Sequence, residues 1–425
     1  MQTSRSVRPQ EADRRQQAIA PVCALLVLSV GTIPEASPSS VLWTAPSILV
    51  AAMLIAWAAE SAQFFIAQGF ALAILAWLQT LPEFAVEAVL AWKQQVPLLM
   101  ANLTGALRLL TGLGWPMIYA TAAVFHRKRH GRPISEIRLS EEHCVEVIGL
   151  LAAMVYASVI CAKSSLTVVD AAVLIGIYVA YLMVLSRMPA EEAESIDDLE
   201  LVPRTIVKSP RNIRIAAIAV LFLGGGALIY FAAEPFLASL LAVSAVMGVP
   251  NFIFVQWVAP FVSEFPEKVS AFYWARTVTR ASTALMNMVS SNINQWTLLA
   301  AMLPITYSLS RGAVSPIPLD AEQQFELLMT LGQSLLAALF LVDMRLRWYE
   351  AAGLFGLWAI QFAFSPVKPG PSLAGFLATH IHLWVTVAYF AWCALEIGRM
   401  FAGRRHPEAF RQFALMWRKH IRRVV

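Results

Sequence analysis

The sequence has little charge for its length. Of its 425 residues, 14% are Asp, Glu, Lys or Arg and 58% are hydrophobic, and the mean hydropathy is +0.63. Soluble globular domains hold about 25% charged residues. The shortage of charge therefore excludes an ordinary soluble domain and predicts an all-α polytopic membrane protein. The length of such a chain indicates how many membrane spans it holds, not how many soluble domains.

Cysteine is also scarce, and the motifs of common enzymes are missing. The four cysteines fall in apolar segments and form no C-x-x-C pair, so we expect small buried hydrophobes rather than a disulfide framework or a zinc site. The sequence has no phosphate-binding loop, no Ser-His-Asp arrangement and no redox pair. It therefore predicts neither an enzyme nor a cofactor, and its basic residues do not indicate nucleic-acid binding.

Apolar segments recur along the chain and predict twelve membrane-spanning helices. The first lacks a small-residue cleavage site, which favours a spanning helix over a signal peptide. The polar linker 188–214 separates two groups of spans, 41–187 and 215–366. One additional span precedes them together with the N-terminus, at 1–40, and another follows them together with the C-terminal tail, at 367–425. The Gly- and Pro-rich span 98–125 is expected to be unwound at its middle. The expected spans are 18–33, 41–65, 70–92, 98–125, 144–161, 166–185, 215–246, 251–274, 281–309, 325–342, 348–364 and 373–397.

Basic residues gather on one side of this arrangement. Twenty-six of the 32 Lys and Arg residues fall in the termini and in alternate loops on the side of the N-terminus, and four fall on the other side. Arg108 and Lys268 fall inside spans. The positive-inside rule therefore places both termini in the cytoplasm of a protein of the bacterial inner membrane.

Two apolar spans contain a carboxylate directly after a proline. Glu83 directly follows Pro82, and Glu267 directly follows Pro266. The two glutamates are 184 residues apart along the chain. A charged side chain at the centre of a spanning helix costs at least ~2.5 kcal/mol, so it indicates a function. Proline frees a carbonyl one turn back, and free carbonyls with carboxylates are ligands for Na⁺ or Ca²⁺. We interpret the pair as an ion site and include nearby oxygens of Thr80, Gln79, Ser263 and Glu264; the alternative is a structural hydrogen-bonding role.

The span after each of these kinks carries polar residues that match between the halves. Asn287 follows Asn102 by 185 residues, and Asn287, Ser291 and Gln295 recur on one helical face next to Asn292. These side chains coordinate a cation in one interpretation and form interhelical hydrogen bonds in the other. The kinked spans are the third and the eighth. Because the eighth comes five positions after the third, an odd number, the two cross the membrane in opposite senses, which predicts inverted repeats.

These segments resemble the two repeats of the calcium/cation antiporter superfamily, which includes the sodium/calcium exchangers. That family carries a G-T-S-x-P-E-like kink and a G-N-x-x-G-S-N-x-x-N-like segment in each repeat. The corresponding segments here are LQTLPE (78–83) with ANLTGALRLL (101–110), and VSEFPE (262–267) with MNMVSSNINQ (286–295). The resemblance covers 41–364 and implies two inverted five-helix repeats with discontinuous helices, plus one extra span at each end.

The resemblance also implies roles for residues. Glu83 and Glu267 are the paired acids that hold Ca²⁺ or Na⁺, Thr80, Ser263 and Ser291 keep hydroxyl ligands, and Asn102 and Asn287 pack the helices. The chain is a divergent member, because several positions depart from the family pattern. Gln79 stands for a Thr, Ala106 and Leu110 for a Ser and an Asn, Glu264 for a Ser, and Arg108 has no counterpart.

Arg108 is charged at any working pH and needs an acidic partner at this depth. Glu83, Glu87 and Glu264 are the candidates, and the ion pair would make Arg108 a tethered cation in the ion site; the alternative is snorkelling to the membrane surface.

The basic tail 399–423, which contains aromatic residues, either lies on anionic membrane lipid or is a solvated positive-inside tail.

We therefore expect a secondary antiporter that exchanges Na⁺ or Ca²⁺ for another cation or a proton. The spans 41–65 and 215–246 are the expected gating pair. Glu264 and Glu87 each occur in one repeat only and are expected to tune the site. The lost oxygens favour an alternative of another class, a transport-inactive homologue that acts as a membrane scaffold or regulator.

Overall fold

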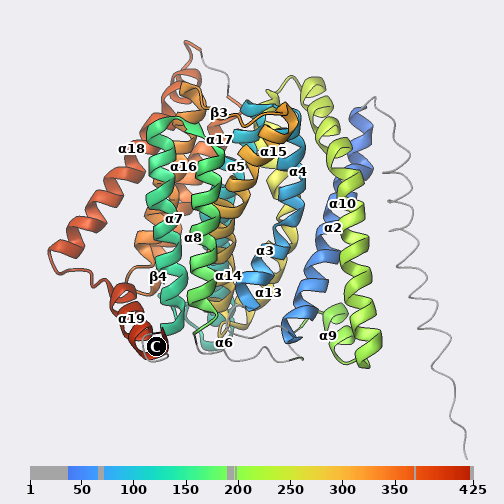
Figure 1. Ribbon diagram of the computed structural model, residues 1–425. Helices are drawn as coiled ribbons and strands as arrows, with labels where there is room; N and C mark the ends of the chain where they lie inside the picture. Colours follow the sequence, from blue (N-terminus) through green and yellow to red (C-terminus); the bar gives the residue numbers. More distant parts are fainter. Residues whose placement is uncertain (1–36, 66–70, 189–195, 197–198, 368–369, 422–425) are drawn as a thin grey trace, which may run out of the picture.

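The structure is a computed structural model, and it describes residues 37–65, 71–188, 196, 199–367 and 370–421. Nearly all of these residues are helical, and the helices run side by side as one bundle (Figure 1). The expected first span, 18–33, lies outside the described residues. Six of the described helices are long and apolar enough to cross a membrane: residues 38–65, 96–130, 141–163, 168–185, 211–247 and 373–401.

The described residues before 188 form seven α-helices. The short helices η1 (Pro38–Ser40), η2 (Gln63–Phe65) and η5 (Glu141–His143) extend or join them, and η4 is a π-helical turn. The main elements are α2 (Val41–Ala62), α3 (Ala71–Gln79), α4 (Leu81–Trp92), α5 (Val96–Leu109), η4 (Leu110–Gly114), α6 (Trp115–His130), α7 (Cys144–Lys163) and α8 (Val168–Leu185).

The remainder of the chain repeats much of this order. The segment expected as a polar linker contains α9 (Leu201–Val207) and the start of α10. The other elements are α10 (Arg211–Met247), α11 (Asn251–Ile253), η7 (Phe254–Val258), α12 (Ala259–Ser263), α13 (Phe265–Thr277), α14 (Ala281–Asn294), η8 (Gln295–Leu299), α15 (Ala300–Arg311), α16 (Ala321–Phe340), α17 (Trp348–Phe364), α18 (Leu373–Phe401), α19 (Glu408–Met416) and η9 (Trp417–Ile421).

Both kinked spans are broken where the prolines predicted it. Helix α3 ends at Gln79 and α4 begins at Leu81, while α12 ends at Ser263 and α13 begins at Phe265. Each proline is the second residue of the new helix, where its missing N–H leaves no intrahelical hydrogen bond unmade. The glutamate that follows each proline therefore lies in the first turn of a helix inside the bundle.

The span 98–125 is not unwound, and that prediction is wrong. Helices α5 and α6 are joined by the π-helical turn η4, which keeps helical backbone angles. A π turn absorbs an extra residue without exposing backbone groups, which suits a segment that is buried throughout. Another π turn, η8, joins α14 to α15 at the matching place in the other half.

Helices α5 and α14 form the centre of the bundle, because almost every side chain along them is buried. Two short antiparallel pairs connect distant loops at the ends of the bundle. Strand β1 (Glu136–Arg138) pairs with β4 (Arg345–Arg347), and β2 (Ser165–Leu166) pairs with β3 (Ile317–Pro318).

Helices α2 and α10 pack along each other at one edge of the bundle (Figure 1). Thr44 Oγ1 and Ser239 Oγ are 2.8 Å apart across this contact. At Gly225 the backbones come so close that an added Cβ would lie 2.8 Å from Cγ1 of Ile55 and 3.0 Å from the carbonyl oxygen of Ala51. The absence of a side chain at Gly225 therefore sets the spacing of the pair.

We predict that Gly225→Val destabilises the protein by about 1–3 kcal/mol, because the added methyl groups overpack the α2–α10 contact. Gly224→Val and Gly226→Val are the controls, since an added Cβ at either position meets nothing within 4 Å and the change in helix propensity is the same. Thermal unfolding in detergent measures the difference. Equal melting temperatures for the three variants would contradict the prediction.

Candidate cation site

The two broken spans place their glutamates against the central helices. Helix α4 contacts α5 and α15, and α13 contacts α14. Glu83 and Glu267 are each 1% exposed, and Glu264, which immediately precedes α13, is 2% exposed. Three carboxylates are thus buried at helix starts, where the first-turn N–H groups favour negative charge.

One amide group connects carboxylates from the two halves of the chain. Gln295 Nε2 donates to Glu83 Oε2 and to Glu264 Oε1, both at 2.7 Å. The two carboxylates therefore lie within two hydrogen-bond lengths of each other. Like charges this close repel in a low-dielectric interior, so they are stable together only with a positive charge or a proton nearby.

Lys268 supplies a positive charge at this point. Its ammonium Nζ lies 2.5 Å from Glu264 Oε2, and its side chain is 5% exposed. Glu264 thus receives hydrogen bonds on both of its oxygens, from Lys268 and from Gln295. Lys268 lies inside an expected span, and its i,i+4 spacing from Glu264 is the signal in the sequence that could have predicted this partner.

Arg108 does not pair with any of the expected acids. Its Nη2 lies 2.6 Å from Glu326 Oε2, so the expected partners Glu83, Glu87 and Glu264 are wrong. Glu326 also accepts from Gln256 Nε2 at 3.0 Å and lies 3.1 Å from His382 Nδ1. A fully buried guanidinium needs several partners, and α16 provides two of them, Glu326 and Met329, only after the chain folds.

Four of the expected neutral ligands make contacts with other polar side chains. Asn287 Nδ2 donates to Gln79 Oε1 at 3.2 Å, and Thr80 Oγ1 accepts from Asn294 Nδ2. Asn102 Nδ2 donates to Glu87 Oε1 at 3.2 Å. These bonds agree with the helix-packing interpretation, and they orient the remaining amide oxygens. Ser263 Oγ donates only to the carbonyl of Pro260, at 3.3 Å.

A set of buried oxygens in the same region lacks hydrogen-bond partners among the described residues. Both carboxylate oxygens of Glu267 belong to it, although the side chain is almost fully buried. A buried polar group without a partner is costly, and oxygen atoms of this kind are the ligands that Na⁺ and Ca²⁺ prefer. The other members are Glu83 Oε1, Glu87 Oε2, Asn102 Oδ1, Asn287 Oδ1, Ser291 Oγ, Asn292 Oδ1, Asn294 Oδ1 and Gln295 Oε1.

The arrangement differs from a resident metal centre. Within the described ranges, no three His, Cys, Asp or Glu side chains come together as a metal-binding group. Carboxylates instead alternate with amides and one ammonium. This arrangement has few charged groups, so a cation bound among them would have mostly neutral ligands.

The chain is similar to known proteins over most of its length. The sodium/calcium exchanger protein family matches residues 39–187 and 217–366, which include both kinked spans. The crystal structure of the H⁺/Ca²⁺ exchanger CAX is 30% identical, with a TM-score of 0.82, and the match covers 95% of this chain and 98% of that one. No curated protein matches the chain.

Two other solved structures share the fold at lower identity. Native YfkE has a TM-score of 0.56 at 14% identity, covering 88% of this chain and 99% of that one. The sodium-calcium exchanger NCX_Mj has a TM-score of 0.52 at 18% identity, covering 80% of this chain and 99% of that one. Given the family match over both halves and the identity to CAX, this chain belongs to the sodium/calcium exchanger family of integral membrane ion transporters.

Proposed function

We propose that the protein is a secondary antiporter that exchanges Ca²⁺ or Na⁺ for another cation or for protons by alternating access. The observation that carries the proposal is the buried group of Glu83, Glu264 and Glu267, two of which share the amide of Gln295. The similarity to an H⁺/Ca²⁺ exchanger makes Ca²⁺ and H⁺ the first ions to test.

Glu83 and Glu267 are the proposed main ligands. Each has carboxylate oxygens without hydrogen-bond partners among the described residues, so each can bind a cation without first breaking a bond. Ser291 and the side-chain oxygens of Asn287 and Asn292 add neutral ligands from α14. Together they replace part of the hydration shell that a hard cation loses on leaving water.

Lys268 is the proposed tethered cation of the site, in place of Arg108. Its ammonium neutralises Glu264, which leaves Glu83 and Glu267 for the transported ion. Glu87 is bonded to Asn102 and tunes the local charge. The two negative charges of Glu83 and Glu267 are then balanced by one divalent ion or by two monovalent ions. Exchange of a divalent cation for monovalent cations requires a site that both can neutralise.

The proposed architecture is a pair of inverted repeats, 41–187 and 215–366. Its support is the element order: a break at Thr80 and at Glu264, helices of 14 residues in α5 and α14, and the π turns η4 and η8 that follow them. Helices α2 and α10, which pack as a pair at the edge, are the proposed gate that slides against the rest.

Ala106 and Leu110 carry no side-chain oxygen where the family pattern has ligands. This loss favours a second candidate, a transport-inactive scaffold or regulator. Ion flux by the unmutated protein in liposomes distinguishes the two candidates. No flux in gradients of Na⁺, K⁺, Ca²⁺ or H⁺ would support the scaffold.

We predict that Glu83→Gln and Glu267→Gln each reduce cation-coupled flux to the level of empty liposomes. The cation loses negative charge that neutral amides cannot replace, while removal of a buried charge does not hinder membrane insertion. Glu322→Gln, at the exposed first turn of α16, is the matched control and should keep wild-type flux. Wild-type flux in both site variants would refute the proposed site.

Lys268→Gln is predicted to change the charge moved per transport cycle, because Glu264 becomes available to another positive ion. Lys268→Arg retains the charge and should leave the coupling as in the wild type. The reversal potential of Ca²⁺ flux in liposomes with a set membrane potential measures this quantity. The tethered-cation role is wrong if Lys268→Gln transports with the wild-type reversal potential.

We also predict that both termini and the loop 127–138 are cytoplasmic, in the inner membrane of a bacterium. The distribution of basic residues is the support. Reporters fused at the C-terminus and in the loop 34–40 should give opposite locations. An external C-terminus would overturn both the orientation and the inverted repeats.

A further inference from the structure

A basic cavity lies at one end of the bundle, away from the cation site. It is about 550 Å³ in volume and is formed by β4, the connection from α18 to α19, and the start of α19. Five of its nine lining residues are arginines: Arg345, Arg347, Arg404, Arg405 and Arg411. In Figure 1, β4 and α19 lie at the same end of the bundle as the C-terminal end of α6 and α9.

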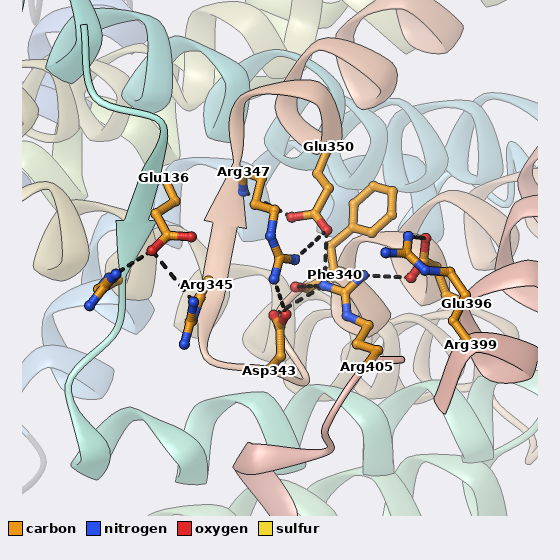
Figure 2. A network of polar contacts seen from close by, with 10 residues as sticks. Glu136, Phe340, Asp343, Arg345, Arg347, Glu350, Glu396, Arg399 and Arg405 are labelled. Atoms are coloured by element: carbon orange, nitrogen blue, oxygen red, sulfur yellow. Dashed lines mark hydrogen bonds and ion pairs between the residues drawn. The ribbon is translucent and has the colours of Figure 1, made fainter. Parts of the chain in front are cut away.

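The inner wall of the cavity, formed by Asp343, Arg347 and Arg405, belongs to an ion-pair network with balanced charge. Arg405 is buried and contacts Glu396 Oε2 at 2.6 Å, Glu350 Oε1 at 2.9 Å and Asp343 Oδ1 at 3.1 Å (Figure 2). Its Nη2 also donates to the carbonyl oxygen of Phe340 at 2.5 Å. The network sets three arginines against three carboxylates: Arg347, Arg399 and Arg405 against Asp343, Glu350 and Glu396.

This wall is structural. It joins the loop between α16 and α17 to the end of α18 and to the segment before α19 (Figure 2). Burial lowers the pKa of Arg405, and the carboxylates of Glu350, Asp343 and Glu396 more than offset it, so the pKa is raised above its usual value. The guanidinium therefore stays charged at every working pH, and the cavity is held open by a fixed frame.

The mouth of the cavity, in contrast, has an excess of positive charge. Arg404 makes no ion pair with another described residue. Arg345 lies 3.6 Å from Glu136, but that carboxylate is already paired with Arg138 at 2.7 Å. Arg411 is paired with Glu408 at 2.6 Å and cancels it. The excess is thus two positive charges, one from Arg404 and one from the group of Arg345, Arg138 and Glu136.

The surroundings of the mouth match the depth of lipid headgroups. Helix α18 is an apolar span of 29 residues that ends at Phe401, which is 90% exposed, and α19 follows after a short connection. Phe410, Leu415 and Trp417 are exposed along α19 and η9. Exposed aromatic residues beside the end of a spanning helix are typical of an amphipathic segment in the membrane interface.

We propose that this cavity binds the phosphate group of an anionic phospholipid. Arg345 and Arg404 would contact the phosphate oxygens, because guanidinium groups donate paired hydrogen bonds to phosphate. The two excess charges match a phosphate monoester, which carries about −1.5 to −2 at neutral pH. A bound headgroup would connect β4 with the α18–α19 segment and so stabilise this end of the bundle.

The test uses the purified full-length protein in detergent. Thermal unfolding is followed with phosphatidic acid, phosphatidylglycerol, phosphatidylcholine or inorganic phosphate added. We expect phosphatidic acid, a phosphate monoester, to raise the melting temperature most, phosphatidylglycerol, a diester with one negative charge, to raise it less, and phosphatidylcholine to leave it unchanged. Stabilisation by inorganic phosphate alone, without an effect of the lipids, would identify a free phosphate as the ligand and overturn the lipid proposal.

Variants locate the effect. The double variant Arg345→Gln with Arg404→Gln should weaken lipid binding at least about tenfold, because two charge-assisted hydrogen bonds are lost. Its unliganded melting temperature shows whether the frame remains intact. Arg132→Gln removes an exposed arginine of the basic loop 127–138 and should bind lipid as the wild type does. Equal lipid binding by the double variant and the wild type would refute the proposal.

Discussion

The structure depends on the placement of negative charge in a bundle that otherwise buries apolar surface. An ionised carboxylate in a low-dielectric interior costs several kcal/mol unless charge or hydrogen bonds compensate it. Glu264 is compensated completely, by Lys268 and by the amide of Gln295. Glu83 shares that amide, and Glu267 has no hydrogen-bond partner among the described residues. The three carboxylates are therefore compensated to different degrees, and the two with the fewest partners, Glu83 and Glu267, are the proposed ligands of the ion.

The backbone geometry places these carboxylates inside the bundle. The breaks before Leu81 and Phe265 turn one long span into two short helices, so that a glutamate lies in a first helical turn inside the bundle. The central helices that face these breaks stay intact through π turns, which keep their backbone hydrogen-bonded while they shift the side-chain register. The breaks at Thr80 and Glu264 and the π turns η4 and η8 are covered by protein, as the absence of water requires.

Two further charged clusters show how the same constraint acts elsewhere. Arg108 and Glu326 neutralise each other between α5 and α16, with Gln256 as an additional donor. At the end of the bundle, Arg405 is bonded to acids from three different segments. The Arg108–Glu326 pair connects the two halves of the chain. The cluster around Arg405 connects the loop between α16 and α17, and α17 itself, to the last span, α18.

The sequence alone determined the features that depend on local chemistry. Composition and hydropathy predicted a helical membrane protein, and the two Pro-Glu dipeptides predicted the helix breaks, because proline acts on the turn in which it occurs. The match of the 78–110 and 262–295 segments also predicted the family, since ligand-bearing motifs are short and contiguous.

Only the tertiary structure decided which charges meet. Arg108 has acids near it in sequence, yet it pairs with Glu326, more than 200 residues away, because helix packing rather than sequence distance sets the partner. The Gly- and Pro-rich stretch after it remains helical because α14 and α17 cover it. Lys268 is the opposite case: its partner Glu264 is one turn away, but its place between the acids of two halves required α4, α13 and η8 to come together, which no local pattern specifies.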